Sequence, residues 1–190
     1  MVSNMNEKLL IVGAGGFGRV VSDHAVKEYE CSFVDDGYEV GTEICGVKVV
    51  GHIADLASLF AEYKLLAVAI GNNSLRERIY HEAEMIGFQF PNIIAENVYI
   101  STFSAVGQGC IFLNNVCVQN GSKVGNGVIL NPGVEIHHDS MVEDFALIYT
   151  NSVIRTNAKV GKRVKIGSNV SVGNDIEIEA DSVIENGMSL

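Results

Sequence analysis

The chain has 190 residues, 47% of them apolar, and its mean hydropathy of +0.23 is sufficient for a packed core. Its formal charge of −10 would repel a phosphate backbone, so we exclude nucleic acid as a partner. No apolar stretch approaches the ~20 residues that span a bilayer, so we expect no membrane insertion. The four cysteines form no CxxC pair and the N-terminus lacks a signal-peptide pattern, which predicts a cytoplasmic protein with free thiols.

The first predicted elements are a strand, a glycine turn and a helix. Residues 8–12 form an apolar strand that runs into the sequence Gly13-Ala-Gly15-Gly16-Phe17-Gly18. The helix follows at residues 19–29, and its predicted buried side consists of Val20, Val21, His24 and Ala25. A second strand at residues 31–34 ends in the acidic pair Asp35 and Asp36.

Further strands and helices alternate up to about residue 94. They are a strand at 47–50, a helix at 53–63, a strand at 65–70, a helix to about 86 and a connecting segment at 88–94. The third of these ends at Gly71-Asn72-Asn73, and we expect Ser74 to cap the helix that follows. Strands that alternate with helices predict a parallel sheet, in a Rossmann-like βαβαβ arrangement.

The carboxyl ends of parallel strands are where such sheets bind nucleotides. We expect the glycine turn, Asp35, Asp36 and Gly71 to lie at this edge, where glycines let the backbone approach a phosphate and a helix N-terminus favours the anion. The alternative that the glycines only pack a helix against a strand stays open. A nicotinamide dehydrogenase uses the same fingerprint, but about 90 residues leave no room for its second mononucleotide half. A single nucleotide or a nucleotide sugar fits better.

A strict period of six residues begins at Ile94. The repeated positions, all apolar, are Ile94, Ile100, Val106, Phe112, Val118, Val124, Leu130, Ile136, Val142, Ile148, Ile154, Val160, Ile166, Val172, Ile178 and Ile184. Six residues make one short strand and a corner, and three such sides close a triangular coil, so each aliphatic stacks on the one eighteen residues later. We therefore predict a parallel β-helix of about five coils, left-handed by similarity to hexapeptide-repeat proteins, with domains at residues 1–93 and 94–190.

Two further positions of the repeat are regular. Two residues before many of the aliphatics the side chain is small, at Ser104, Cys110, Ser122, Ser140, Ala146, Ser152, Ala158 and Ser182. Directly after several of them stands a glycine, at Gly107, Gly125, Gly161, Gly167 and Gly173. We expect small residues where the corners are crowded, and glycine where the turn requires unusual dihedral angles.

The predicted β-helix carries two histidines, His137 and His138, directly after the repeat aliphatic Ile136. At least one of these side chains must leave the core, and Asp139 follows them. A histidine held by a carboxylate can act as a general base toward an amine or hydroxyl. The other interpretation is a solvated polar corner. A γ-type carbonic anhydrase needs three histidines for its zinc, which two adjacent histidines do not supply, so we predict no metal site.

Five segments in this order resemble the acetyltransferases of bacillosamine and sialic acid modification. They are the glycine turn, Val34-Asp35-Asp36, Ala69-Ile70-Gly71-Asn72-Asn73 with Arg76, Gly127-Val-Ile-Leu-Asn131, and Ile136-His137-His138-Asp139. The resemblance covers nearly the whole chain. It implies a homotrimer that binds a sugar nucleotide through the α/β domain and acetyl-CoA, as co-substrate, along the β-helix between subunits.

The resemblance also assigns roles to individual residues. It implies His138 as general base, Asp139 as the group that orients it, and Asn131 as an active-site asparagine. The residues expected to bind the sugar nucleotide are Gly13, Gly15, Gly16, Phe17, Asp35, Asp36, Gly71, Asn72, Asn73 and Arg76. The residues expected to contact acetyl-CoA are Leu147, Tyr149 and Gly167. No covalent intermediate is needed, because no Cys–His pairing is evident.

Several positions depart from the family pattern. Phe17 replaces a polar residue, Leu147 replaces a second histidine, Tyr149-Thr150-Asn151 replaces a stretch of small residues, and the chain ends at Leu190 without the usual closing segment. The predicted function is acetyl transfer to the amino group of a UDP-4-amino-4,6-dideoxy sugar, for surface polysaccharide or glycan synthesis. A sialic acid O-acetyltransferase and a non-catalytic nucleotide-sugar-binding trimer with a decayed donor site remain as alternatives.

Overall fold

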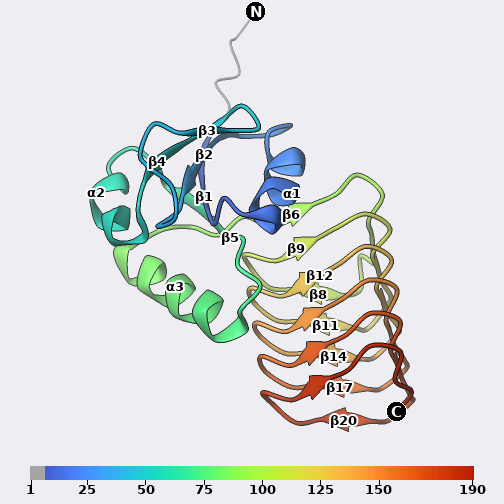
Figure 1. Cartoon of the computed structure of the whole chain (residues 1–190). Coiled ribbons are helices and arrows are strands. Elements are labelled where there is room, and N and C mark those ends of the chain that lie inside the picture. The colour runs from blue at the N-terminus through green and yellow to red at the C-terminus, as the bar shows by residue number, and fades with distance from the viewer. Residues whose placement is uncertain (1–6) are drawn as a thin grey trace, which may run out of the picture. The chain divides into compact units, whose positions relative to one another are not determined.

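A computed structural model of the chain describes residues 7–190, which divide into two compact units between Ile93 and Ile94 (Figure 1). In the first unit a five-stranded sheet has the order β3-β4-β2-β1-β5. Its strands are β1 (Lys8–Val12), β2 (Glu30–Val34), β3 (Glu43–Ile44), β4 (Val47–Gly51) and β5 (Leu65–Val68). β1, β2, β4 and β5 are parallel, while β3 pairs with β4 in the antiparallel sense. The strands β2, β4 and β3 therefore lie on one side of β1, and β5 lies on its other side.

The helices of this unit differ from the predicted ones. α1 (Gly16–Ala25) begins inside the glycine turn and buries Gly18, Val21, Ser22 and Ala25. The prediction that Val20 is buried is wrong: the buried residues follow a spacing of three and four residues, and Val20 lies off that side and is 41% exposed. The segment predicted as one helix at 53–63 consists of a 3₁₀ turn, η1 (Ile53–Asp55), and a short α2 (Leu56–Leu59).

α3 (Asn73–Ile86) is the longest helix of the unit as described. Its N-cap is Asn72, whose side-chain oxygen accepts a hydrogen bond from Leu75 N at 2.9 Å. The expected cap at Ser74 is therefore wrong: an asparagine two residues earlier satisfies the first turn. The helix ends at Gly87, which has φ +112°, a conformation that favours glycine. No helix among residues 7–190 is both long and apolar enough to cross a membrane.

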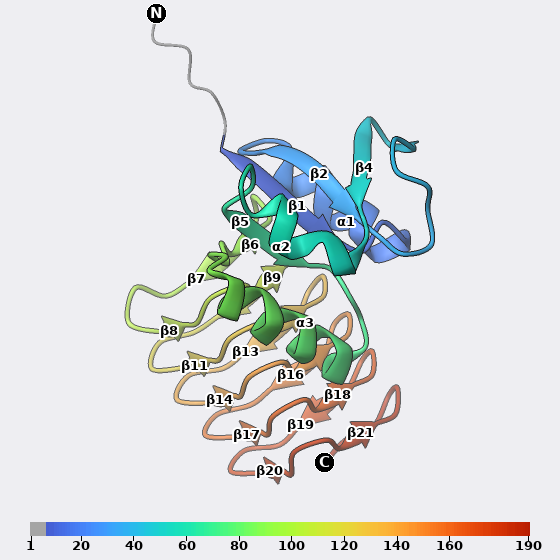
Figure 2. The same ribbon diagram turned by 90° about the vertical axis from the view of Figure 1, so that its left-hand side faces the viewer.

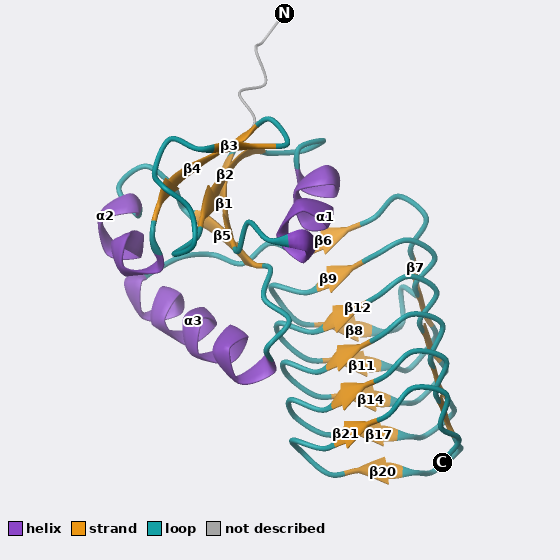
Figure 3. Cartoon of the chain, in the orientation of Figure 1, coloured by secondary structure: helices purple, strands orange, loops and turns teal. Residues whose placement is uncertain are grey.

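The second unit is a left-handed parallel β-helix, in which two-residue strands are joined by loops (Figure 3). The strands form three stacks, and within each stack a strand pairs with the strand eighteen residues away (Figure 2). One stack consists of β7 (Tyr99–Ile100), β10 (Cys117–Val118), β13 (Glu135–Ile136), β16 (Val153–Ile154) and β19 (Ser171–Val172). The second consists of β8 (Ala105–Val106), β11 (Lys123–Val124), β14 (Met141–Val142), β17 (Lys159–Val160) and β20 (Glu177–Ile178). The third consists of β6 (Ile93–Ile94), β9 (Ile111–Phe112), β12 (Ile129–Leu130), β15 (Leu147–Ile148), β18 (Lys165–Ile166) and β21 (Val183–Ile184).

The repeat aliphatics form the core of the β-helix. From Phe112 to Ile178 every one of them is buried, while Ile100 and Ile184 near the two ends are only partly covered. Small polar residues fill the corners as predicted. Ser122 and Ser152 are fully buried. The hydroxyl of Ser122 donates to His137 O, and that of Ser152 donates to Gly167 O. The corners are therefore tight and internally satisfied.

The left-handed backbone conformation falls at another repeat position than expected. From Gly109 to Gly187 every sixth residue, three after each aliphatic, has a positive φ, whether it is glycine, Asn, Asp or another residue. The glycines directly after the aliphatics have no positive φ, so the prediction of unusual dihedral angles there is wrong. They are needed for space: a Cβ at Gly125 would lie 2.7 Å from Asp144 N in the next coil, and one at Gly161 2.6 Å from Ala180 N.

Candidate functional site

The glycine turn lies where β1 and β5 end, at the carboxyl edge of the first unit's sheet. Gly13 N donates to Val34 O at 2.9 Å, and a Cβ at Gly13 would lie 2.8 Å from Ala69 O, so neighbouring strand ends enclose this residue. A Cβ at Gly18 would lie 1.8 Å from Gly13 O, which explains why α1 can start so close to the strand. Gly15 and Gly16 are exposed, and no atom outside the chain neighbours lies within 4 Å of a Cβ built at Gly15. Phe17 beside them is partly buried.

The two acidic residues after β2 hold backbone groups at the same edge. Asp35 accepts hydrogen bonds from Ala14 N at 2.7 Å and from Gly37 N at 2.8 Å, so its carboxylate ties the glycine turn to the end of β2. Asp36 accepts one from Ile53 N at 2.8 Å, at the start of η1. Both side chains therefore position the loops around the expected nucleotide site. Contact of either one with a nucleotide base stays a prediction.

The residues after β5 also shape this edge. Gly71 and Asn72 are exposed, and Asn73 begins α3 with its side chain partly covered. Arg76 is only 1% exposed, and its guanidinium donates to Ile70 O at 2.8 Å. This arginine thus supports the loop from inside, and its predicted contact with the sugar nucleotide is not tested.

His138 lies at the corner that joins β13 to β14, and its side chain is 54% exposed. The imidazole has a partner on each nitrogen: Nδ1 lies 2.8 Å from Asp139 Oδ2, and Nε2 lies 3.0 Å from the hydroxyl of Thr156, one coil further on. The backbone N–H of His138 donates to Gln119 Oε1 at 3.1 Å, from the preceding coil. His137 points elsewhere, with Nε2 3.2 Å from Glu135 Oε2. The two histidines therefore have separate surroundings.

Asp139 occupies one of the left-handed corner positions, with φ +62°. Asn and Asp adopt this conformation more readily than other residues with a Cβ. The coil before it carries Gly121 at the equivalent position, where a Cβ would lie 2.2 Å from Asp139 Oδ1. The His138–Asp139 contact therefore depends on the absence of a side chain one coil away.

The remaining predicted site residues gather at a different corner of the β-helix. Asn131 follows β12 and donates to Ile148 O at 3.1 Å, while Tyr149 and Gly167 stand eighteen and thirty-six residues further on, in the same column. Tyr149 and Gly167 line a pocket of about 350 Å³ together with Lys165 and Ser168, and Lys165 Nζ lies 5.6 Å from the centre of the Tyr149 ring. Leu147 is buried and is only 3% exposed. Within one chain, this corner and the His138 corner are separated by one side of the triangular coil.

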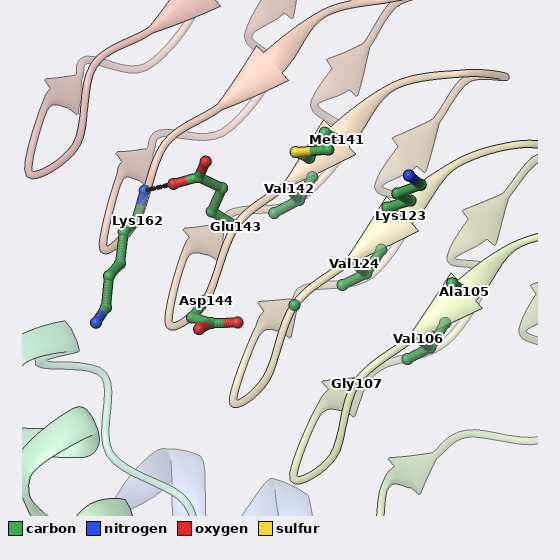
Figure 4. A pocket seen from close by; sticks show the side chains of 11 residues that line it. Ala105, Val106, Gly107, Lys123, Val124, Met141, Val142, Glu143, Asp144 and Lys162 are labelled. Atoms are coloured by element: carbon green, nitrogen blue, oxygen red, sulfur yellow. Dashed lines mark hydrogen bonds between the residues drawn. The ribbon is translucent and has the colours of Figure 1, made fainter.

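A groove runs along β8, β11 and β14 (Figure 4). The last of these strands, β14, follows directly after the corner that carries His138. Its volume is about 460 Å³. Ala105, Lys123 and Met141 stand on successive strands of this groove, and the backbone N–H of Lys162 donates to Glu143 Oε2 at 3.1 Å at one end. The lining is uncharged along β8, Lys123 stands on the middle strand β11, and Glu143, Asp144 and Lys162 make the end beyond β14 charged.

Comparison with known proteins gives this geometry a family. Residues 8–83 match the model of the PglD N-terminal domain. The acetyltransferase domain of PglB from Neisseria gonorrhoeae FA1090, solved in complex with acetyl coenzyme A, is 30% identical, with a TM-score of 0.86, over 97% of this chain and 95% of that one. The chain belongs to this family of sugar N-acetyltransferases.

Two further structures of acetyltransferases agree with it. Another structure of the PglB acetyltransferase domain is 28% identical, with a TM-score of 0.91, over 97% of this chain and 91% of that one. A histidine-to-asparagine variant of perosamine N-acetyltransferase from Caulobacter crescentus, in complex with CoA and GDP-perosamine, is 27% identical, with a TM-score of 0.92, over 96% of this chain and 88% of that one. The family and the fold predicted from the sequence are confirmed.

Sequence reasoning missed two residues that touch His138. They are Gln119 and Thr156, which precede and follow it by one coil. The repeat could have predicted them, because residues about eighteen apart stack in a β-helix. Both side chains are uncharged, so they were not considered as partners of a histidine.

Two of the four thiols are poorly suited to act as a nucleophile. Burial raises the pKa of the Cys31 thiol to about 11, and burial together with the charge of Glu135 raises the pKa of Cys117. A thiol with a raised pKa stays protonated and is a poor nucleophile near neutral pH. Among residues 7–190, no cluster of three or more His, Cys, Asp or Glu side chains is arranged to hold a metal ion.

Proposed function

We propose that this protein transfers the acetyl group of acetyl-CoA to the amino group of a nucleotide-linked amino sugar. The observation that carries the proposal is the His138 imidazole, half exposed and fixed through Nδ1 by Asp139, on a β-helix of the sugar N-acetyltransferase family. A carboxylate accepts hydrogen bonds only, so its partner Nδ1 carries the proton and Nε2 is left as the basic atom. This is the arrangement that a general base requires.

The reaction follows from that arrangement. The amine nitrogen attacks the thioester carbonyl carbon, the new C–N bond forms, and the C–S bond breaks. The amine proton passes to Nε2 of His138 and from there to the departing sulfur, which leaves an amide and the free thiol of CoA. Asp139 stabilises the imidazolium formed in between, and backbone N–H groups stabilise the oxyanion. No enzyme nucleophile takes part.

The acceptor binds through the first unit. Gly15 and Gly16 offer exposed backbone N–H groups at the start of α1, where the helix dipole favours the anionic diphosphate. Asp36, exposed beyond the end of β2, is available to the ribose or the base. UDP is our leading choice of nucleotide and a 4-amino-4,6-dideoxy sugar our leading choice of acceptor. The product would serve glycan or surface polysaccharide synthesis in the cytoplasm.

The donor lies along the column of Asn131, Tyr149 and Gly167. The pocket beside this column contains Lys165, whose ammonium suits a phosphate of CoA. Because the column and His138 stand at different corners, acetyl-CoA on one protomer reaches the imidazole of a neighbouring protomer in our proposal. We propose a homotrimer, in which these two corners of neighbouring protomers meet around a threefold axis and form three equivalent sites.

The test is the His138→Ala variant, assayed with acetyl-CoA and a panel of nucleotide 4-amino sugars and sialic acids. We expect kcat to fall by about 10²- to 10⁴-fold, the typical contribution of a general base. His137→Ala is the matched control, since His137 faces Glu135 instead, and it should retain most of the activity. Mass spectrometry of the products separates amides from esters. Unchanged turnover in His138→Ala would contradict the mechanism.

A second candidate is a nucleotide-sugar-binding trimer without transferase activity. It is favoured by Leu147, an apolar and buried side chain where a second histidine is expected to contact the donor. A thermal-shift experiment with acetyl-CoA and with UDP-sugars separates the two functions. A ligand present at a hundredfold excess over its Kd stabilises the native state by ~2.7 kcal/mol, which is readily detected. A response to the sugar nucleotide alone would support the binding protein.

A further inference from the structure

Thr156 contacts the same ring nitrogen that the proposed reaction uses. Its hydroxyl lies 3.0 Å from Nε2 of His138, and the residue stands one coil after the histidine, at the equivalent corner. It is partly buried, and its carbonyl accepts a hydrogen bond from Asp175 N at 3.1 Å, so the next coil holds its backbone in place. A β-branched side chain on a fixed backbone has few rotamers. The hydroxyl is therefore presented to the ring from a rigid support.

The direction of this hydrogen bond follows from the group on the other side of the ring. Asp139 lies 2.8 Å from Nδ1 and, as a carboxylate, must accept, so the neutral imidazole carries its proton on Nδ1. Nε2 then has a lone pair, and the Thr156 hydroxyl is the donor. The reverse tautomer would direct two lone-pair-bearing atoms, Nδ1 and Oδ2, at each other. Asp139 and Thr156 thus select the same tautomer from opposite sides of the ring.

We propose that Thr156 is a positioning residue of the transfer reaction, acting through His138. This inference rests on the proposed function, in which Nε2 takes the proton of the acceptor amine. By donating to Nε2, the hydroxyl holds the ring so that this lone pair points toward the corner where Thr156 lies, and it favours the tautomer with the proton on Nδ1. The acceptor amine arrives at that lone pair and replaces the hydroxyl as its partner. The corner of Thr156 is therefore where the reacting nitrogen of the sugar binds.

The kinetic test compares Thr156→Val with Thr156→Ser. Valine keeps the branched shape and removes the hydroxyl, while serine keeps the hydroxyl. We expect Thr156→Val to lower kcat by about 3- to 10-fold, the contribution of one neutral hydrogen bond, with the KM for acetyl-CoA unchanged. Thr156→Ser should restore most of the parent's kcat. Equal rates for the parent and the valine variant would overturn the proposal, as would a serine variant as slow as the valine variant.

A double-mutant cycle shows whether Thr156 acts through the histidine. In a His138→Ala background the valine substitution should have no further effect on the remaining rate, because its target is gone. Losses that simply multiply would mean that Thr156 has a separate structural role, and would overturn the proposal.

Imidazole ¹⁵N spectra provide a readout that does not depend on activity. At about pH 9, well above the ordinary pKa of imidazole, the parent's His138 should show one tautomer with the proton on Nδ1, and Thr156→Val should show a mixture. His138→Gln identifies the signal among the five histidines. An identical tautomer ratio in both proteins would overturn the role of Thr156. A parent that acetylates no substrate but shows the tautomer change would refute the proposed function, and with it the role of Thr156 in transfer, while the control of the His138 tautomer by Thr156 would still hold.

Discussion

Replacing Gly121 with alanine separates the contribution of Asp139 from that of His138 without changing either residue. A Cβ at Gly121 would lie 2.2 Å from Asp139 Oδ1, well inside van der Waals contact, so the carboxylate must rotate away from the imidazole. Gly187 is a matched control. It has the same φ of +73°, but no atom lies within 4 Å of a Cβ built there. The two variants share the backbone strain and differ in the clash.

The magnitudes of the two effects are distinct. Alanine in the left-handed region costs about 1–2 kcal/mol, and this loss of stability should appear equally in both variants. In Gly121→Ala, moving the carboxylate off its rotamer adds only about 0.5–1.5 kcal/mol, since the atom that clashes is the end of a flexible side chain. The loss of a charge-assisted hydrogen bond to the imidazolium is worth about 1.5–3 kcal/mol in the transition state. We therefore expect kcat to fall by about 10- to 100-fold.

Initial rates of thiol release from acetyl-CoA, measured together with the unfolding midpoints, test this prediction. Gly187→Ala should be somewhat less stable than the parent and fully active. Gly121→Ala should be slightly less stable than Gly187→Ala and much less active. If both variants keep the kcat of the parent, Asp139 does not orient the base. If both lose activity equally, backbone strain alone is responsible and the reasoning from the clash fails.

Three further outcomes follow from the structure. Ile136→Ala should lower the free energy of unfolding by about 2–5 kcal/mol in chemical denaturation, because Ile136 is fully buried; Ile184→Ala, at the partly covered end of the core, should cost clearly less. Asp35→Ala should raise the Kd of the sugar nucleotide in titration calorimetry and leave acetyl-CoA binding unchanged, because the glycine turn loses the acceptor of Ala14 N. Above about pH 8.5 the unfolded chain releases the Cys31 proton while the folded chain retains it up to pH about 11, so stability should fall across this interval, and Cys31→Ala should make that slope clearly shallower.

The repeat made the second unit predictable in detail. A period of six that holds phase across sixteen apolar positions leaves one architecture open, since each aliphatic has to stack on the next coil. What the pattern did not reveal was the reason for its glycines. Gly125 and Gly161 occur where the backbone of the next coil passes within 3 Å of a Cβ, and this proximity is a property of the closed coil. The left-handed positions lie two residues later and accept Asn and Asp, so glycine content alone does not mark them.

The first unit was predicted less completely, because its motifs serve the protein as well as a ligand. The glycine turn and the acidic pair were found at the expected edge of the sheet. Yet Asp35 uses its carboxylate to fix Ala14 and Gly37, and Arg76, which was expected to bind the sugar nucleotide, is buried and donates to Ile70 O. A charged residue after a strand has the same place in the sequence whether it binds a ligand or fixes the protein's own backbone. Only its partners, which come from other strands, distinguish the two roles.

The geometry around His138 shows why a β-helix is suited to holding one imidazole. The corner of each coil is fixed by the corners before and after it, so a side chain there has one neighbour on each side at a constant spacing of about eighteen residues. For His138 these are Gln119, which binds its backbone N–H, and Thr156, which binds Nε2, while Asp139 at the left-handed position binds Nδ1. Of the two groups that bind the ring, Thr156 therefore follows from the repeat, and Asp139 follows from its place directly after the histidine. The same rule, applied to the sequence, places Gly121 before Asp139 and so identifies in advance the position where an added methyl group would disturb the base.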